Sequence, residues 1–322
     1  MIRVENLTKT FGPKIAVNGI SFSVERGEVL GFLGPNGAGK STSMRMITGF
    51  IPPIAGKITI GGHDMIEDPL PAKRMIGYLP ENAPAYSDMT VYGFLNFTAE
   101  LRGLNGDERK KAVNRVVETC FLETVIHQSV DTLSKGYRHR TCFAQSIIHD
   151  PDILILDEPT DGLDPNQKHE VRTLIRRMGE KKAIVFSTHI LEEVEAACTR
   201  AIIIDRGQIV ANGTPSELKQ KSDVAGAVLV RVRGTNMGDL KDRLNQAGAA
   251  RKVAIVKEDR GAITARIYPK GATDGELARN VADIIAAQRW HLEELHTEEG
   301  RLDEVFRSIT LPETVVAQEE TK

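Results

Sequence analysis

The stretch GPNGAGKS at residues 34–41 decides the fold of this chain. It fits the pattern G-x-x-x-x-G-K-[ST] at every fixed position, and it lies between a predicted apolar strand, Glu28–Leu33, and a predicted helix, Ser41–Thr48. The glycines leave room for a phosphate against the backbone amides, and the helix N-terminus adds a positive dipole end. A strand, a loop and a helix in this order predict an α/β domain that binds a nucleotide.

Each residue type in the loop has a chemical reason to be there. Lys40 is expected to neutralise the β- and γ-phosphates, and the Ser41 hydroxyl is expected to hold Mg²⁺. The alternative is a Gly-rich turn that fits the pattern by accident, which the flanking strand and helix make the weaker interpretation. The predicted nucleotide-binding residues of the loop are Asn36, Gly37, Ala38, Gly39, Lys40, Ser41 and Thr42.

A second motif, ILILDEP at residues 153–159, lies downstream. Its four apolar residues suit a strand that is buried on both faces. An acid at the end of that strand would place Asp157 beside the phosphate loop, where it can order Mg²⁺, and Glu158 would then position or deprotonate the attacking water. A buried strand followed by a solvated acidic turn is the alternative, and it would be preferred if the motif stood alone.

The remaining pattern predicts an α/β domain over residues 1–218, followed by a different module. Strands alternate with helices in this first part, as in a largely parallel sheet covered by helices. Two strands near the N-terminus would add an antiparallel β layer, and residues 88–148 would form a helical subdomain. The predicted strands are Arg3–Thr8, Ser21–Val24, Glu28–Leu33, Ile58–Ile60, Ile153–Leu156, Ala183–Ser187 and Ala201–Asp205. The predicted helices are Ser41–Thr48, Asp107–Thr119, Tyr137–Ile148, Pro165–Met178 and Leu191–Cys198.

After a predicted linker at 219–225, residues 226–310 follow the order β-α-β-β-α-β, which predicts a small ferredoxin-like α+β domain. A last helix is expected at Leu302–Ile309, and residues 311–322 are expected to be a flexible polar tail. The predicted strands are Val228–Val232, Lys252–Lys257, Ala262–Ile267 and His291–Leu295. The predicted helices are Leu240–Gln246 and Gly275–Gln288.

Three further motifs are specific to one family. The stretch LSKGY at residues 133–137 resembles the L-S-G-G-Q signature of ABC ATPases, DGLD at 161–164 resembles their D-loop, and His189 resembles their switch histidine. Phe11 lies at the distance of the aromatic residue that stacks on adenine. The motifs follow the order of the family over about residues 2–218.

The resemblance implies ATP and Mg²⁺ as cofactors and a site shared by two chains. A signature helix N-terminus presents a hydroxyl, amides and a positive dipole, which would cap a γ-phosphate held by a second chain in a head-to-tail pair. The resemblance assigns Glu158 and His189 to catalysis and Ser41, Glu81 and Asp157 to the metal. The further residues that it implies are Phe11 and Val17 for nucleotide, Ser134, Lys135 and Gly136 for the signature in trans, and Asp164 in the D-loop.

The chain departs from the family pattern at some of these positions. Glu81 replaces the usual glutamine, and Lys135 and Tyr137 replace the commoner glycine and glutamine of the signature. These substitutions resemble those of exporter subunits with a C-terminal extension, such as drug-export ATPases and the gliding-motility ATP-binding protein. The segment Arg301–Phe306 resembles the L-E-D-V-F ending of such subunits, and an ordinary amphipathic helix is an equal alternative.

Composition limits the partners. With 27% charged residues and a net charge of −2, the chain shows no excess of positive charge for nucleic acid, and we expect no nucleic-acid partner. Its apolar runs are only strand-length and no secretion signal precedes them, so a cytoplasmic protein is expected, peripheral on the cytoplasmic face of the cell membrane through its permease. The three cysteines are expected to be free buried thiols.

The expected function is therefore an ATP-binding and ATP-hydrolysing subunit that powers a separate membrane-spanning exporter. Its partners would be permease subunits and a second copy of itself or a paralogous ATPase. The alternative is a soluble ABC ATPase that acts on ribosomes or another cytoplasmic complex. Ribosome-acting members usually carry two ATPase domains in one chain, whereas the phosphate loop occurs once here.

Overall fold

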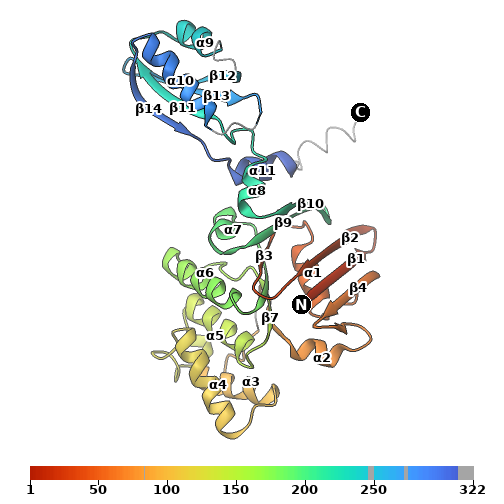
Figure 1. Cartoon of the computed structure of the whole chain (residues 1–322). Coiled ribbons are helices and arrows are strands. Elements are labelled where there is room, and N and C mark those ends of the chain that lie inside the picture. Colours follow the sequence, from red (N-terminus) through yellow and green to blue (C-terminus); the bar gives the residue numbers. More distant parts are fainter. Residues whose placement is uncertain (83, 246–249, 272–274, 311–322) are drawn as a thin grey trace. The chain divides into compact units, whose positions relative to one another are not determined.

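The computed structural model describes residues 1–82, 84–245, 250–271 and 275–310 (Figure 1). The chain divides into two compact units between Pro215 and Ser216, slightly before the boundary that we expected after Leu218. The tail predicted at 311–322 lies outside the described residues. In the described part of the chain, no helix combines the length and the apolar character that crossing a bilayer requires.

The first unit is built on a six-stranded sheet with the order β10-β9-β3-β8-β7-β6. The strands β3, β6, β7, β8 and β9 are parallel to their neighbours, and only β10 is antiparallel, to β9. Every residue of β3, β7 and β8 is buried, as expected for parallel strands covered on both faces. The bounds are β3 (Val29–Leu33), β6 (Ile76–Leu79), β7 (Ile153–Asp157), β8 (Ala183–Thr188), β9 (Arg200–Asp205) and β10 (Gln208–Gly213).

Alternate side chains of this sheet point into two separate cores, because successive residues of a strand face opposite sides. Ile153 and Ile155 of β7 pack with α1 (Lys40–Ile47) on one face. Leu154 and Leu156 pack on the other face with α6 (Pro165–Gly179) and α7 (Leu191–Ala197) (Figure 1). Burying each of these side chains stabilises the fold by roughly 1.5–3 kcal/mol relative to exposure.

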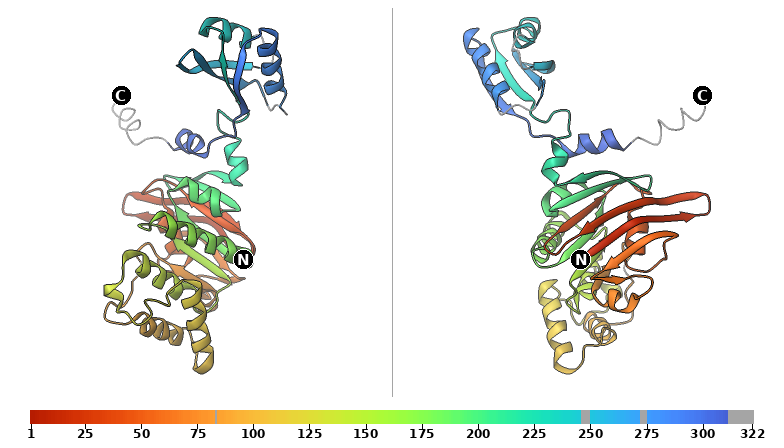
Figure 2. Two further views of the ribbon diagram at one scale, coloured as in Figure 1. Left: turned by 90° about the vertical axis from the view of Figure 1, so that its left-hand side faces the viewer. Right: turned by 45° about the vertical axis from the view of Figure 1, so that its right-hand side comes forward.

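An antiparallel sheet of order β2-β1-β4-β5 completes the core on the α1 side. Its main hairpin, drawn in red in Figure 2, joins β1 (Ile2–Phe11) to β2 (Lys14–Val24) and is longer than the sequence predicted. The partner strands are β4 (Ala55–Ile60) and β5 (His63–Asp64), and the short helix α2 (Pro69–Arg74) follows. This hairpin brings the residues near its turn to the phosphate loop.

The insert between β6 and β7 is helical. It contains α3 (Val91–Leu101), α4 (Gly106–Thr119), a short 3-10 helix (Val130–Thr132) and α5 (Lys135–Ile147). The helix α3 was not located individually from the sequence, and neither were the short strands β6 and β10. The Gly77 of β6 breaks the apolar run in a strand of four residues, so periodicity alone has little to identify.

The second unit contains a four-stranded sheet of order β12-β13-β11-β14 in which all neighbours are antiparallel. With one helix after β11 and one after β13, this is the β-α-β-β-α-β arrangement of a ferredoxin-like module. Its core lies between the sheet and the two helices, around Val230, Leu240 and Val281. The elements are β11 (Val228–Arg233), α9 (Met237–Asn245), β12 (Ala250–Asp259), β13 (Ala262–Pro269), α10 (Glu276–Ala287), β14 (His291–Thr297) and α11 (Leu302–Ile309).

The segment at 219–225, which we expected to be a linker, lies inside the second unit and is packed. The side chains of Ser222 and Val224 are buried, and Ser222 Oγ donates a hydrogen bond to Glu304 Oε2 of α11 at 2.6 Å. The short helix α8 (Pro215–Lys219) spans the division between the units. The polar composition of the segment did not reveal these contacts.

Candidate nucleotide site

The phosphate loop requires glycine at two positions. Gly39 adopts φ 109° as the residue before α1, and a Cβ there would lie 2.4 Å from the Ala16 carbonyl oxygen. A Cβ on Gly34 would lie 2.4 Å from the Ile204 carbonyl oxygen. Both positions therefore need a residue without a side chain, and the loop amides stay accessible at the start of α1.

Lys40 is held at the centre of the site. Its Nζ donates to the carbonyl oxygens of Gly34 at 2.8 Å and of Pro35 at 3.3 Å. The same Nζ lies 3.5 Å from Glu158 Oε1, and the two side chains are only 6% and 11% exposed. A cation in such a sheltered position interacts strongly with a phosphate that approaches it.

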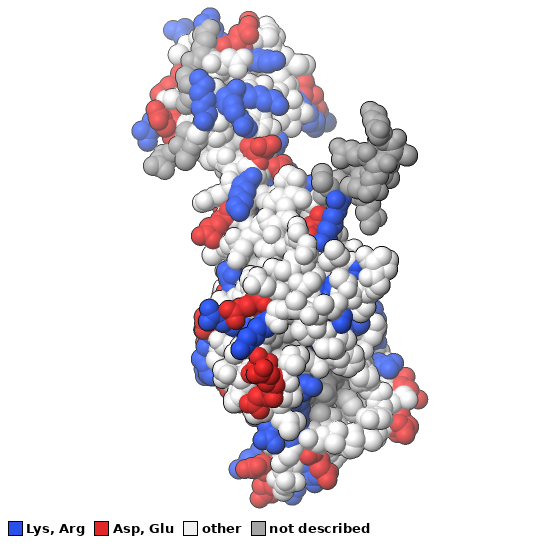
Figure 3. Space-filling model, turned by 90° about the vertical axis from the view of Figure 1, so that its right-hand side faces the viewer, with Lys and Arg blue, Asp and Glu red and all other residues white. Residues whose placement is uncertain are grey.

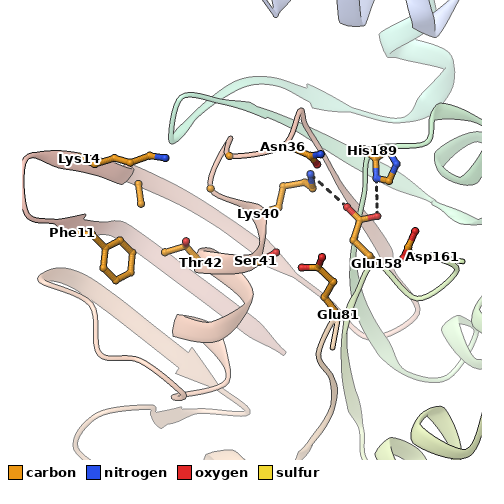
Figure 4. Close-up of a pocket in the computed structure, with 13 residues that line it drawn as sticks. Phe11, Lys14, Asn36, Lys40, Ser41, Thr42, Glu81, Glu158, Asp161 and His189 are labelled. Atoms are coloured by element: carbon orange, nitrogen blue, oxygen red, sulfur yellow. Dashed lines mark hydrogen bonds and ion pairs between the residues drawn. The ribbon is translucent and has the colours of Figure 1, made fainter. Parts of the chain in front are cut away.

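Glu158 lies between Lys40 and His189, as Figure 4 shows. Its Oε2 is 3.0 Å from His189 Nδ1, and its backbone N–H donates to Ser187 Oγ at 3.0 Å. Glu158 adopts φ 49°, a strained conformation for a residue with a long side chain. Such strain is typical of functional sites, and here it directs the carboxylate from the end of β7 toward the loop.

Asp157 is hydrogen-bonded to the last residue of the phosphate loop. Its Oδ1 accepts hydrogen bonds from Ser41 Oγ at 3.1 Å and from Ser187 Oγ at 2.5 Å. Its Oδ2 is buried and finds no hydrogen-bond partner among the residues that the structure describes. An unpaired buried carboxylate oxygen is costly, so this atom is a position where a cation or its bound water fits.

The donor set fits magnesium. Ser41 and Asp157 supply hard oxygen ligands side by side, and the carboxylate of Glu81 lines the same cleft. No cluster of three or more His, Cys, Asp or Glu side chains suited to a metal occurs among the residues that the structure describes. A magnesium ion here would take its other ligands from phosphates and water, as it usually does.

The phosphate loop, Glu81 and Glu158 border a cleft of about 620 Å³, whereas Asp157 is not among its lining residues. Phe11 and Lys14 lie at one end, and Glu158, Asp161 and His189 lie at the other (Figure 4). Ten of the predicted site residues line it. They are Phe11, Asn36, Gly37, Gly39, Lys40, Ser41, Thr42, Glu81, Glu158 and His189.

Two residues predicted to touch the nucleotide do not line the cleft. Val17 has no exposed surface and packs in the core on the α1 side, while its neighbour Ala16 lines the cleft. Ala38 is also buried, and its backbone joins the loop to Gly207. The sequence prediction missed Lys14, Ala16 and Asp161 as lining residues, and of these only Asp161 lay in a motif already identified.

The signature residues lie outside this cleft. Ser134 is exposed and caps α5, where its Oγ accepts from the Tyr137 N–H at 3.4 Å. Lys135 Nζ lies 3.5 Å from Asp161 Oδ2 and packs over Gly162, where a Cβ would meet it at 1.7 Å. Gly136 is buried against the Gln167 side chain, which a Cβ would approach to 2.5 Å. The signature is thus attached to the D-loop of its own chain.

Asp164 has a structural role in this chain. It caps α6, with its Oδ1 accepting from the Gln167 N–H at 2.9 Å, and the Gln167 side chain accepts from the Asp164 N–H in return. This capping box fixes the direction of α6 directly after the D-loop.

Burial is the largest cause of several shifted pKa values in the helical insert between β6 and β7. Burial lowers the pKa of His139, on α5, to about 4, so this imidazole is neutral near pH 7. Burial raises the pKa of the Cys120 thiol to about 12 and that of Cys142 to about 11. In the described part of the chain none of the three cysteines forms a disulfide, and Cys120 and Cys142 are buried, so these two act as small apolar side chains.

The comparisons with known proteins agree with this geometry. The linearmycin resistance ATP-binding protein LnrL of Bacillus subtilis is 36% identical over 237 residues, which cover 73% of this chain and 76% of LnrL. This chain belongs to the ABC transporter family. The family described as ABC transporter matches residues 17–161. The Nod factor export ATP-binding protein I of Burkholderia lata is 35% identical over 248 residues, which cover 76% of this ABC ATPase and 80% of that protein.

Two solved structures share the fold. An ATP binding subunit of an ABC transporter superposes with a TM-score of 0.64 at 28% identity, over 69% of this chain and 92% of that one. The dimeric ATP-binding cassette MJ0796 bound to ADP and Pi superposes with a TM-score of 0.62 at 22% identity, over 67% of this chain and 99% of that one. The predicted P-loop ABC ATPase fold and the exporter-branch resemblance are therefore confirmed. This ABC ATPase binds and hydrolyses ATP as the ATP-binding subunit of a transporter.

Proposed function

We propose that this ABC ATPase powers a separate membrane-spanning exporter by closing head to tail with a second ATPase chain when both bind ATP. The observation that carries the proposal is the position of Ser134, which is exposed and lies outside the cleft around Lys40. A helix N-terminus with an exposed serine hydroxyl suits a γ-phosphate, and in this arrangement that phosphate belongs to another chain. The relatives named for resistance and export support the direction of transport.

In the proposed reaction, the amides of residues 36–41 hold the phosphates and Lys40 turns from Glu158 to the γ-phosphate. Glu158, freed from that ion pair, orients the attacking water and accepts its proton. His189, 3.0 Å from Glu158, holds the γ-phosphate or the water in place. Ser41, Asp157 and Glu81 would hold Mg²⁺, which neutralises the charge that develops on the phosphates.

A second hollow of about 640 Å³ provides a surface for the permease. It is rich in exposed apolar side chains, among them Phe50 (73% exposed) and Leu101 (70% exposed). Tyr86 packs edge-on against Phe97, with 5.5 Å between the ring centroids. Exposed apolar surface of this kind is typical of interaction sites. We call it the α1–α3 groove, because Arg45 of α1 and Leu101 of α3 both line it.

The occupant that we propose for the α1–α3 groove is a short amphipathic helix of the permease with at least one acidic residue. Arg45 and Arg102 both line the groove and supply positive charge. The groove also adjoins the nucleotide cleft, because Pro80 and Asn82 line the groove whereas Glu81 between them lines the cleft. A helix docked there would sense the position of Glu81 and so the state of the nucleotide.

The proposed location is the cytoplasmic face of the membrane, peripherally through the permease. On the face shown in Figure 3, basic and acidic side chains are interspersed over the first unit, which does not suggest direct binding to an anionic surface. Residues 226–310 are proposed to be an accessory domain.

Affinity purification of the Glu158→Gln chain with ATP from detergent-solubilised native membranes tests the proposal. We expect a membrane protein with several spans to co-purify in roughly stoichiometric yield. Leu101→Asp in the α1–α3 groove should abolish this co-purification. Ile54→Asp, at an exposed apolar residue that does not line the groove, should leave it intact. Ribosomal or chromosomal proteins in place of a membrane protein would reject the exporter in favour of a soluble ABC ATPase.

A further inference from the structure

Glu193 of α7 is a buried carboxylate that does not line the nucleotide cleft. Its side chain is 1% exposed, and both of its oxygens accept hydrogen bonds from threonine hydroxyls. Thr160 Oγ1 donates to Oε1, and Thr188 Oγ1 donates to Oε2 at 2.6 Å. Both threonines are themselves buried, so this is a closed polar group in the interior. A carboxylate is retained in such a place only if it is fully hydrogen-bonded.

Each threonine lies within two residues of a residue that we assign to catalysis. Thr188 directly precedes His189, and its Oγ1 also accepts from the Ile190 N–H at 3.0 Å. The residues on both sides of His189 are therefore held by one chain of hydrogen bonds that ends on Glu193. Thr160 lies in the turn that begins at Glu158, where the Asp161 N–H donates to the Glu158 carbonyl oxygen at 3.1 Å.

We infer that Glu193 is a positioning residue that sets the 3.0 Å contact between His189 Nδ1 and Glu158 Oε2. The inference rests on the proposed roles of Glu158 and His189. The His189 side chain is 47% exposed, so its own packing does not fix the ring and its backbone must do so. Glu158 holds a strained φ of 49°, which persists only where the surroundings impose it.

The chemistry of the group explains why a carboxylate is needed. An ionised carboxylate only accepts hydrogen bonds, so it can take both hydroxyl protons at once. A glutamine has one acceptor oxygen and one NH₂ group, and the NH₂ would face one of the two threonine hydroxyls. One hydroxyl would then lose its acceptor, and the loop on that side would be less well held.

The experiment measures ATP affinity, kcat and KM on the full chain. Glu193→Gln and Thr188→Val should each lower kcat by about tenfold or more and change ATP affinity by less than about threefold, because phosphate binding does not involve them. Thr188→Ser keeps the hydroxyl and should restore kcat. Thr48→Val is the matched control, because it removes a buried hydroxyl that donates to the Met44 carbonyl oxygen at 2.9 Å.

A double-mutant cycle separates positioning from a general loss of structure. In the His189→Ala background, adding Thr188→Val should lower kcat by less than about twofold, because there is no longer a ring to position. If Thr188→Val lowered kcat by the same factor in the His189→Ala background as in the wild type, this inference would be overturned while the proposed function would stand. A Thr188→Ser chain with a kcat as low as that of Thr188→Val would have the same consequence. Wild-type kcat in His189→Ala by itself would overturn both the proposed role of His189 and this inference.

Discussion

Replacing Glu158 by glutamine should separate ATP binding from ATP hydrolysis. The substitution keeps the shape of the side chain and removes its charge and its ability to accept a proton. General-base catalysis typically contributes about 10²- to 10⁴-fold to a rate, so we expect kcat to fall by that factor. At 1.36 kcal/mol per tenfold change, this raises the barrier by about 3–5 kcal/mol.

The same substitution should strengthen ATP binding. Lys40 Nζ lies 3.5 Å from Glu158 Oε1, and at an effective dielectric constant of about 20 their attraction is about 5 kcal/mol. ATP must compete with this ion pair for Lys40, and Glu158 also repels the γ-phosphate. Desolvation offsets much of the attraction, so the expected gain is up to about tenfold in Kd, or about 1.4 kcal/mol.

Two assays on the same preparation check this pair of effects. Phosphate release gives kcat, and titration with a fluorescent ATP analogue gives Kd. Asp152→Asn is a suitable control, because Asp152 precedes the other end of β7 and pairs with Arg26 at 2.5 Å. Hydrolysis at the wild-type rate by Glu158→Gln would refute its assignment as the base, and weaker ATP binding would refute the electrostatic argument.

Three further predictions concern binding, assembly and pH. Lys40→Ala should lose ATP affinity by at least about tenfold in the same titration, because the main positive charge of the site is removed; equal affinity would contradict its role. Ser134→Arg should bind ATP normally and stay monomeric with ATP, even in the Glu158→Gln background, when analysed by size exclusion with light scattering; an ATP-dependent dimer would contradict the signature in trans. The free energy of unfolding should fall as pH drops from about 6.5 toward 4, because the pKa of His139 is lowered to about 4 in the folded chain and the unfolded chain takes up the proton first. His139→Asn should make chemical denaturation less dependent on pH over this window, and an unchanged slope would show that His139 does not contribute.

The contiguous motifs of the site could be predicted from the sequence alone. The glycines of residues 34–41 and the buried strand before Asp157 depend on short-range backbone geometry, which residue types report directly. The same holds for the alternation of helices and strands that predicted the α/β class and the ferredoxin-like order of the second unit.

Contacts between distant segments were decided only by the tertiary structure. The ion pair of Lys40 with Glu158 and the contact of Glu158 with His189 join the ends of three strands, β3, β7 and β8, that only the sheet order makes neighbours. Glu193 belongs to this group as well, because a glutamate on an amphipathic helix ordinarily faces solvent.

Val17 and Ala16 show most clearly where prediction from the sequence ends. The sequence by itself determined that residues of this segment would lie near the phosphate loop, through the resemblance to the ABC ATPase pattern. Only the structure decided that Ala16 lines the cleft and that Val17 is buried in the core. Successive side chains of a strand point to opposite faces, so a shift of β2 by one residue would put Val17 in the cleft and Ala16 in the core. The pairing of β2 with β1 and its packing on the phosphate loop fix which of the two residues faces the cleft.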